Sequence, residues 1–196
     1  MPGARGDDEV AHLVQRLHGP AVDLGVGEGW RALTAWVLGV AAAAWLLVDT
    51  LRSISTPQRR RQLAEQMGKA GGIDYFDLRS GREAALFQGV AFTAGLTEEV
   101  IFRGFVMLTF AMLLPFWAAV AASAVLFVAF HAYQGVAGMV RIIPITMVLS
   151  VLVVLGGTLW PAILVHIVAD MVGGIMLWGA REEWAAHREA VRYPQA

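Results

Sequence analysis

Apolar residues fill the chain almost without interruption from residue 84 to residue 178, and an earlier apolar run extends from Ala32 to Val48. A run of about 17 residues is just long enough to cross a bilayer as a helix. Helix-breaking residues divide the later block into four segments, and these breakers are Pro115, the Gln134-Gly135 pair, and Gly156-Gly157 followed by Pro161. The predicted helices of this block cover 84–114, 116–133, 139–155 and 160–179. The pattern therefore predicts an all-α, polytopic transmembrane helix bundle of about five membrane helices.

Polar stretches flank these runs. Near the N-terminus, Val10, Leu13, Val14 and Leu17 fall at helical spacing, which is typical of an interfacial helix. The stretch 49–83 holds seven of the fifteen basic residues, so the positive-inside rule places this loop in the cytoplasm, and the helix count returns the C-terminus to the same side. We expect three regions: 1–83 with one membrane helix and the basic loop, a membrane core at 84–179, and a polar tail at 180–196.

Composition agrees with a membrane protein. Hydrophobic residues make up 57% of the 196 residues and charged residues only 16%, against about 25% charged in a soluble domain. Mean hydropathy is +0.58. The net charge of −1 gives no reason to expect a nucleic-acid partner. The absence of cysteine excludes disulfides, a thiol nucleophile and thiolate metal ligands.

Few ionisable side chains interrupt the apolar block, and a charge at bilayer depth costs about 2.5–3.5 kcal/mol on insertion scales. Arg141 lies near a predicted helix end, where its side chain can reach the interface. The other six form three clusters on three predicted helices: Glu98, Glu99 and Arg103; His131; and His166 with Asp170. If the polar faces point inward, four of these side chains converge on one pocket, namely Glu98, His131, His166 and Asp170.

Spacing within the clusters indicates which side chains share a helix face. Glu99 and Arg103 are four residues apart, as are Phe127 and His131, and His166 and Asp170. We expect Glu99 to neutralise Arg103 as a structural ion pair. Glu98 lies about 100° around the helix from Glu99, so it is free to face a different environment.

Together these motifs resemble the signature of the CPBP family, the CAAX-processing and bacteriocin-processing (Abi) intramembrane proteases, which include CAAX prenyl proteases of the Ras-converting type. The matching pattern is Glu98-Glu99-x-x-x-Arg103, then Phe127-x-x-x-His131, then His166-x-x-x-Asp170. The resemblance covers about residues 84–178. It implies an intramembrane endopeptidase, here in a small version typical of a prokaryotic inner membrane.

Amide hydrolysis requires an activated water, an oxyanion stabiliser and a proton for the leaving amine. The resemblance and this chemistry assign the base to Glu98, the orientation of the water to His131, and a hydrogen bond to the oxyanion to His166, whose ring Asp170 would hold. Glu98, His131 and His166 also form a three-ligand set for a divalent metal such as zinc. The sequence leaves metal-free and metal-assisted water activation both open.

Other chemistries fit less well. The chain has no H-E-x-x-H motif, and Asp170 is the only aspartate of the block, which excludes an aspartyl dyad there. Ser123 and Ser150 are better explained by helix packing than by nucleophilic catalysis. A proton-coupled transporter, a non-catalytic scaffold and a bacteriocin-immunity protein remain as alternatives.

We therefore expect a protease that acts on a membrane-bound or lipidated polypeptide in contact with membrane lipid. Five glycines are expected to allow close helix contact, namely Gly89, Gly95, Gly104, Gly173 and Gly174.

Overall fold

The computed structural model describes residues 25–70 and 78–192, and within these ranges all regular structure is helical. The helices are α2 (Gly29–Ser53), α3 (Pro57–Ala70), α4 (Gly81–Glu99), the π-helix η1 (Val100–Val106), α5 (Met107–Ala111), α6 (Phe116–Phe130), the 3-10 turn η2 (Ala132–Gln134), α7 (Gly135–Gly156), α8 (Trp160–Gly179) and α9 (Arg181–Arg192). The predicted interfacial helix around Val10 lies outside the described residues.

The predicted membrane bundle is confirmed. Four helical segments of the described chain are long and apolar enough to span a bilayer, and Phe116–Phe130 is a shorter apolar helix. The four segments are Gly29–Ser53, Gly81–Ala111, Ala132–Gly156 and Trp160–Gly179. The described residues therefore form an integral membrane bundle of four spanning segments and one shorter apolar helix.

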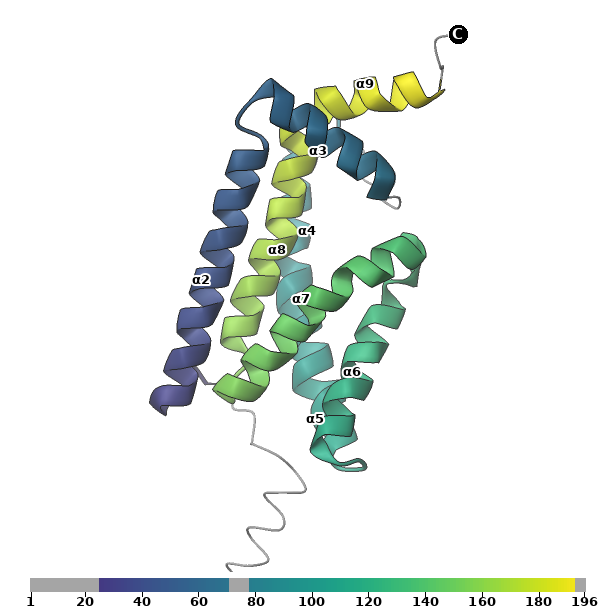
Figure 1. The fold of residues 1–196 in the computed structure, drawn as a ribbon. Coiled ribbons are helices and arrows are strands. Elements are labelled where there is room, and N and C mark those ends of the chain that lie inside the picture. Colours follow the sequence, from purple (N-terminus) through teal and green to yellow (C-terminus); the bar gives the residue numbers. More distant parts are fainter. Residues whose placement is uncertain (1–24, 71–77, 193–196) are drawn as a thin grey trace, which may run out of the picture.

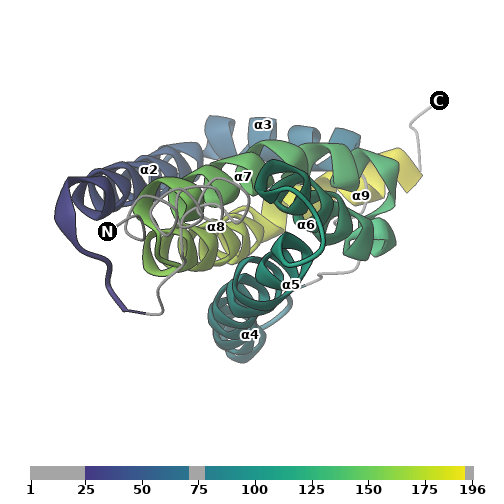
Figure 2. The ribbon, with the colours of Figure 1, turned by 90° about the horizontal axis from the view of Figure 1, so that it is seen from below.

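Helix α8 packs against α2, α4 and α7, and the two views of the ribbon show it among these three (Figures 1 and 2). The buried core along this contact combines Ala35 of α2, Met107 of α5, Leu149 and Val153 of α7, and Val165 of α8. His166 follows Val165 about 100° further around α8, and both residues are buried, so α8 carries core packing and a candidate site residue side by side.

Helix α4 begins at Gly81, three residues before the predicted start at 84, because Ser80 caps it. The Ser80 hydroxyl accepts a hydrogen bond from the Glu83 backbone N–H at 3.2 Å, and the Glu83 carboxylate accepts one from the Ser80 N–H at 3.2 Å. This reciprocal capping box satisfies two backbone donors at the helix start.

The long predicted helix 84–114 is observed as one continuous segment, Gly81–Ala111, whose middle is the π-helix Val100–Val106. The π-helix starts immediately after Glu99. Ser123 of α6 donates a hydrogen bond to the Phe102 carbonyl at 2.7 Å, which ties α6 to this widened turn. Such π segments are frequent at functional sites.

The turn between α6 and α7 is tighter than predicted. Helix α6 ends at Phe130 rather than at residue 133, because His131 leaves the helical region with φ −91° and ψ 13°. Helix α7 begins at Gly135 rather than at residue 139, and Gly135 takes a positive φ of 73°, a backbone conformation that glycine adopts readily. The chain thus reverses within four residues, directly beside His131.

The polar segments predicted as a loop and a simple polar tail are partly helical, which corrects that description. Helix α3 forms within 49–83 and α9 within 180–196, and Figure 1 shows both lying across one end of the bundle. They pack through Ala64, Met67 and Trp184, and Arg60 Nε lies 2.7 Å from Glu183 Oε1. The basic segment and the tail thus share one side, as predicted. The assignment of that side to the cytoplasm stays a prediction.

Candidate active site

The three predicted motif segments meet where α4 and η1 approach α6 and α8. Glu98 and Glu99 are the last residues of α4, His131 follows the end of α6, and His166 and Asp170 lie one turn apart on α8. The structure brings together all six of the charged or imidazole side chains that the sequence singled out. Each of them takes part in an ion pair or a close contact with another member.

A buried network forms the base of the site. Glu99 Oε1 accepts a hydrogen bond from Arg103 Nη1 at 2.8 Å and another from His166 Nδ1 at 2.8 Å. The side chains of Glu99 and Arg103 are 0% and 1% exposed. Arg103 Nη2 also donates to the Thr146 carbonyl of α7 at 3.4 Å. The ion pair expected from the sequence is present, and it also links α4, α7 and α8.

Phe127 fills the space between this network and the histidines. The Arg103 guanidinium carbon lies 4.3 Å from the centre of the Phe127 ring, a cation–π contact. The same ring lies 4.6 Å from the His131 ring and 5.7 Å from the His166 ring, centre to centre. Phe127 is 2% exposed. Its place in the motif is explained by packing, because one apolar ring fixes three polar side chains.

The partners of the two Nδ1 atoms fix the histidine tautomers. His166 Nδ1 faces the Glu99 carboxylate, and His131 Nδ1 lies 2.8 Å from the Phe127 carbonyl oxygen. A carboxylate and a carbonyl only accept hydrogen bonds, so each Nδ1 carries the hydrogen. In a neutral ring the Nε2 atom then presents a lone pair, so neutral His166 cannot donate the hydrogen bond to the oxyanion that the sequence analysis expected of it. Sequence spacing suggested that Asp170 holds the His166 ring, but the structure gives that role to Glu99.

Glu98 faces both of these Nε2 atoms. Its Oε2 atom lies 3.9 Å from His131 Nε2 and 3.8 Å from His166 Nε2. This oxygen is buried and has no hydrogen-bond partner, although the Glu98 side chain as a whole is 29% exposed. The 100° offset predicted between the two glutamates thus gives one buried structural carboxylate and one carboxylate open to the site.

Asp170 lies at the outer edge of the cluster. Its Oδ2 atom is 3.7 Å from His166 Nε2, beyond hydrogen-bond range, and its side chain is 37% exposed. Tyr133, which the sequence did not single out, stacks beside His131 with 5.9 Å between ring centres and is 60% exposed. Asp170 and Tyr133 are therefore the site's most accessible polar and aromatic side chains.

The carboxylate oxygen and imidazole nitrogens of the site are atom types that bind divalent metals such as zinc. Three acceptor atoms converge, Glu98 Oε2 and the Nε2 atoms of His131 and His166, and both rings give their other N–H to an oxygen, as metal-binding histidines do. Bonds of 2.0–2.1 Å in a tetrahedron would separate the ligand atoms by about 3.4 Å. The observed gaps are wider, and among the described residues no three such side chains form a ready metal-binding group. Binding would require the side chains to close by about half an ångström.

The two serines considered as nucleophiles are engaged elsewhere. Ser123 donates to the Phe102 carbonyl, and Ser150 donates to the Thr146 carbonyl at 2.9 Å. Both are buried, and both act within or between helices. The packing interpretation from the sequence is the one that the structure supports.

Close contact between α4 and α8 depends on Gly95. A Cβ atom there would lie 2.7 Å from the Ile167 backbone N and 2.8 Å from its Cα. The prediction of close contact is confirmed at Gly95, but it is wrong for Gly89 and Gly173, because a Cβ at either would meet nothing within 4 Å. Gly95 lies one turn before Glu99, so it sets the distance across which Glu99 reaches His166.

We expect Gly95→Ala to destabilise the protein by about 1–3 kcal/mol, the usual cost of overpacking, and to lower activity by moving Glu99 away from His166. Thermal unfolding in lipid nanodiscs measures the first effect. Gly89→Ala on the same helix is the matched control and should be neutral or slightly stabilising. Equal behaviour of the two variants would contradict the role given to Gly95.

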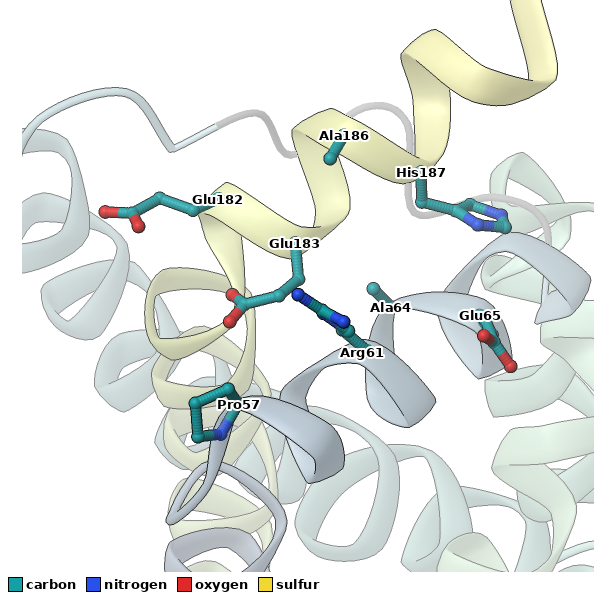
Figure 3. A pocket seen from close by; sticks show the side chains of 8 residues that line it. All are labelled: Pro57, Arg61, Ala64, Glu65, Glu182, Glu183, Ala186 and His187. Atoms are coloured by element: carbon teal, nitrogen blue, oxygen red, sulfur yellow. The ribbon is translucent and has the colours of Figure 1, made fainter. Parts of the chain in front are cut away.

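A separate charged hollow of about 490 Å³ lies between α3 and α9 (Figure 3). It is lined by Pro57, Arg61, Ala64, Glu65, Glu182, Glu183, Ala186 and His187. None of these residues belongs to the glutamate–histidine cluster of the candidate site, which consists of Glu98, Glu99, Arg103, His131, His166 and Asp170. The hollow is a feature of the α3–α9 contact and not part of the candidate active site.

Fold and site together define a polytopic helical membrane protein in which one carboxylate and two imidazoles converge inside the apolar block. Residues 81–172 match the family model described as type II CAAX prenyl endopeptidase Rce1-like. Over this segment the chain is therefore similar to the CAAX proteases. Comparison with curated proteins and with solved structures gave no match.

Proposed function

We propose that the protein is an intramembrane endopeptidase that hydrolyses a peptide bond of a membrane-associated or lipidated polypeptide, in a prokaryotic inner membrane with α3 and α9 on the cytoplasmic side. The observation that carries the proposal is Glu98 Oε2, which faces two imidazole Nε2 atoms without a hydrogen-bond partner of its own. A structural carboxylate in a membrane would be held by a cation, as Glu99 is by Arg103 through Oε1, although Glu99 Oε2 also has no hydrogen-bond partner. An unpaired one beside two imidazoles is suited to bind and deprotonate a water.

The proposed reaction follows from the positions of these side chains. A water between Glu98 and the Nε2 atoms gives a proton to the Glu98 carboxylate, and its oxygen forms a bond with the substrate carbonyl carbon. The carbon–nitrogen bond then breaks, and Glu98 returns the proton to the leaving amine. The products are a carboxylic acid and an amine, so atoms and charges balance.

The remaining side chains orient the reactants. His131 holds the water with Nε2, because the Phe127 carbonyl keeps its Nδ1 hydrogen. Glu99 keeps His166 Nε2 turned toward Glu98. Asp170, one turn further along α8, is exposed enough to meet the substrate backbone. Glu98, His131 and His166 would hold a divalent metal such as zinc, which would supply polarisation of the water and of the carbonyl.

The function is tested by profiling peptide termini in membranes that contain either the wild-type protein or Glu98→Gln. We expect new termini from membrane-associated polypeptides only with the wild type, and these identify the substrate. A transporter would instead move a solute in liposomes without creating termini. A scaffold or immunity protein would create no termini and would keep its effect in Glu98→Gln. Either result would reject the protease proposal.

Metal dependence is tested on purified protein. Three acceptor atoms that face one another without a donor favour a cation among them, so we expect chelation to reduce cleavage and added zinc to restore it. Elemental analysis should find about one metal per chain, and less in His131→Ala. Full activity after chelation, with no bound metal, would show that Glu98 and the histidines activate water alone.

A further inference from the structure

An apolar groove runs between α6 and α7, away from the glutamate–histidine cluster. Its volume is about 530 Å³, within the usual range for ligand pockets. The N-terminal half of α6 supplies Phe116, Trp117 and Ala121, and the C-terminal half of α7 supplies Met147 and Val151. Along α6 the nearest groove residue, Ala124, lies about 10 Å from His131, given a rise of 1.5 Å per residue. The groove is therefore distinct from the site of hydrolysis.

Arg31 of α2 is the only charged residue that lines the groove. Its Nε donates to the Leu155 carbonyl at 3.2 Å and its Nη2 to the Val154 carbonyl at 3.1 Å, both at the end of α7. A guanidinium has five N–H donors, so these two bonds leave three. Among the described residues Arg31 has no carboxylate partner in an ion pair. The apolar groove thus ends at the exposed Arg31 guanidinium, which has further N–H groups that can donate hydrogen bonds.

Three tryptophans mark the same end of the bundle as a membrane interface. Trp30, Trp117 and Trp160 begin α2, α6 and α8, and they are 72%, 69% and 41% exposed. Exposed tryptophans at helix ends are typical of the headgroup level of a bilayer. Arg31 follows Trp30 directly, so we expect its guanidinium at the depth of lipid headgroups and the groove beside the hydrocarbon region.

We propose that this groove is a binding site for an anionic phospholipid, with an acyl chain between α6 and α7 and the headgroup phosphate on Arg31. The charge complementarity decides between this occupant and a lipid tail of the substrate. A substrate tail would enter from the active-site end and would place no anion at Arg31. Phe116, at the Arg31 end, lies about 22 Å along α6 from His131.

Photolabelling of the full chain in lipid nanodiscs tests the site. The probe is phosphatidylglycerol with a diazirine on one acyl chain, and phosphatidylcholine with the same diazirine is the comparison. We expect the labelled peptides to come from 116–124 and 147–155. Phosphatidylglycerol should label them about fivefold more than phosphatidylcholine, the ratio expected from one basic residue near the headgroup.

Matched variants separate the contribution of the space in the groove from the contribution of the Arg31 charge. Ala121→Trp fills the groove and should remove most of the labelling, whereas Ala118→Trp, exposed on the same helix but outside the groove, should not. Arg31→Gln should make the two lipids label equally. Arg31→Lys should keep the preference for phosphatidylglycerol, because it keeps the charge. Glu98→Gln should label like the wild type, so this result does not depend on the proposed hydrolysis.

Four outcomes would overturn the proposal. Equal labelling by the two lipids in the wild type would remove the role of Arg31. Labelling spread evenly over the exposed helix faces would indicate ordinary surrounding lipid. Competition by a prenylated peptide would assign the groove to the substrate. Cross-links between protein chains through α6 and α7 would assign it to a second copy of the protein.

Discussion

Glu98→Gln should lower the rate of peptide-bond cleavage by about 10²–10⁴-fold, the usual contribution of one general base. The amide has the size of the carboxylate but takes no proton from water. Purified protein in nanodiscs, with a substrate peptide found by terminus profiling, gives kcat and KM. The loss should be in kcat, because Glu98 is assigned to the reaction and not to substrate binding.

Folding should be unaffected by this change. Glu98 Oε2 has no hydrogen-bond partner to lose, so the thermal unfolding temperature should stay close to that of the wild type. Glu98→Asp keeps the carboxylate but withdraws it by one methylene, and it should retain partial activity. Wild-type kcat in Glu98→Gln would exclude the proposed mechanism, and unfolding of this variant would show that Glu98 is structural.

Glu99→Ala should destabilise the protein by about 3–5 kcal/mol, because it leaves the buried Arg103 guanidinium without its anion. It should also abolish activity, since the His166 ring loses the acceptor that orients Nε2 toward Glu98. Thermal unfolding and cleavage measured on the same preparation give both effects. The contrast with Glu98→Gln is the central test, because neighbouring glutamates are assigned opposite roles.

A double variant separates the two roles of Glu99. In Glu99→Leu with Arg103→Met, both buried charges are replaced by apolar groups of similar size, which is often neutral for stability. This protein should therefore be more stable than Glu99→Ala and yet remain inactive, because nothing holds His166 Nδ1. Recovery of activity together with stability would show that Glu99 does not position His166.

The limits of prediction from the sequence appear at particular residues. The Glu99–Arg103 pair was predictable because i,i+4 spacing on a helix brings side chains together locally. The Glu99–His166 hydrogen bond was not, because it joins residues 67 positions apart and depends on how closely α4 and α8 approach. Spacing favoured Asp170, which is local to His166, and the contact between helices placed Glu99 closer. Gly95 was a usable signal for that contact, but Gly89 on the same helix carried the same expectation and was wrong.

Helix boundaries also divide into those that local sequence signals predict and those that depend on contacts between helices. Helix α6 begins directly after Pro115, as predicted, and α7 ends at Gly156, one residue beyond the predicted 155, since the backbone constraints of Pro115 and Gly157 are local. The helix before Pro115 ends at Ala111, three residues earlier than predicted. The π-helix after Glu99 has no comparable local signal, and part of its support comes from Ser123 on another helix. The helices α3 and α9 were missed because their polar composition hides a small apolar contact that exists only when the two pack together.

By itself, the sequence determined that the chain is a helical membrane protein, and it singled out six ionisable residues as candidates for a site, because burial in a bilayer makes each such residue costly and rare. The tertiary structure decided the division of labour among those six. It placed Glu99 in a buried network with Arg103 and His166, and it left Glu98 open to both histidines. The physical reason is that composition and hydrophobic periodicity determine the properties of each single helix. The direction of a hydrogen bond between two helices is set only by how those helices pack.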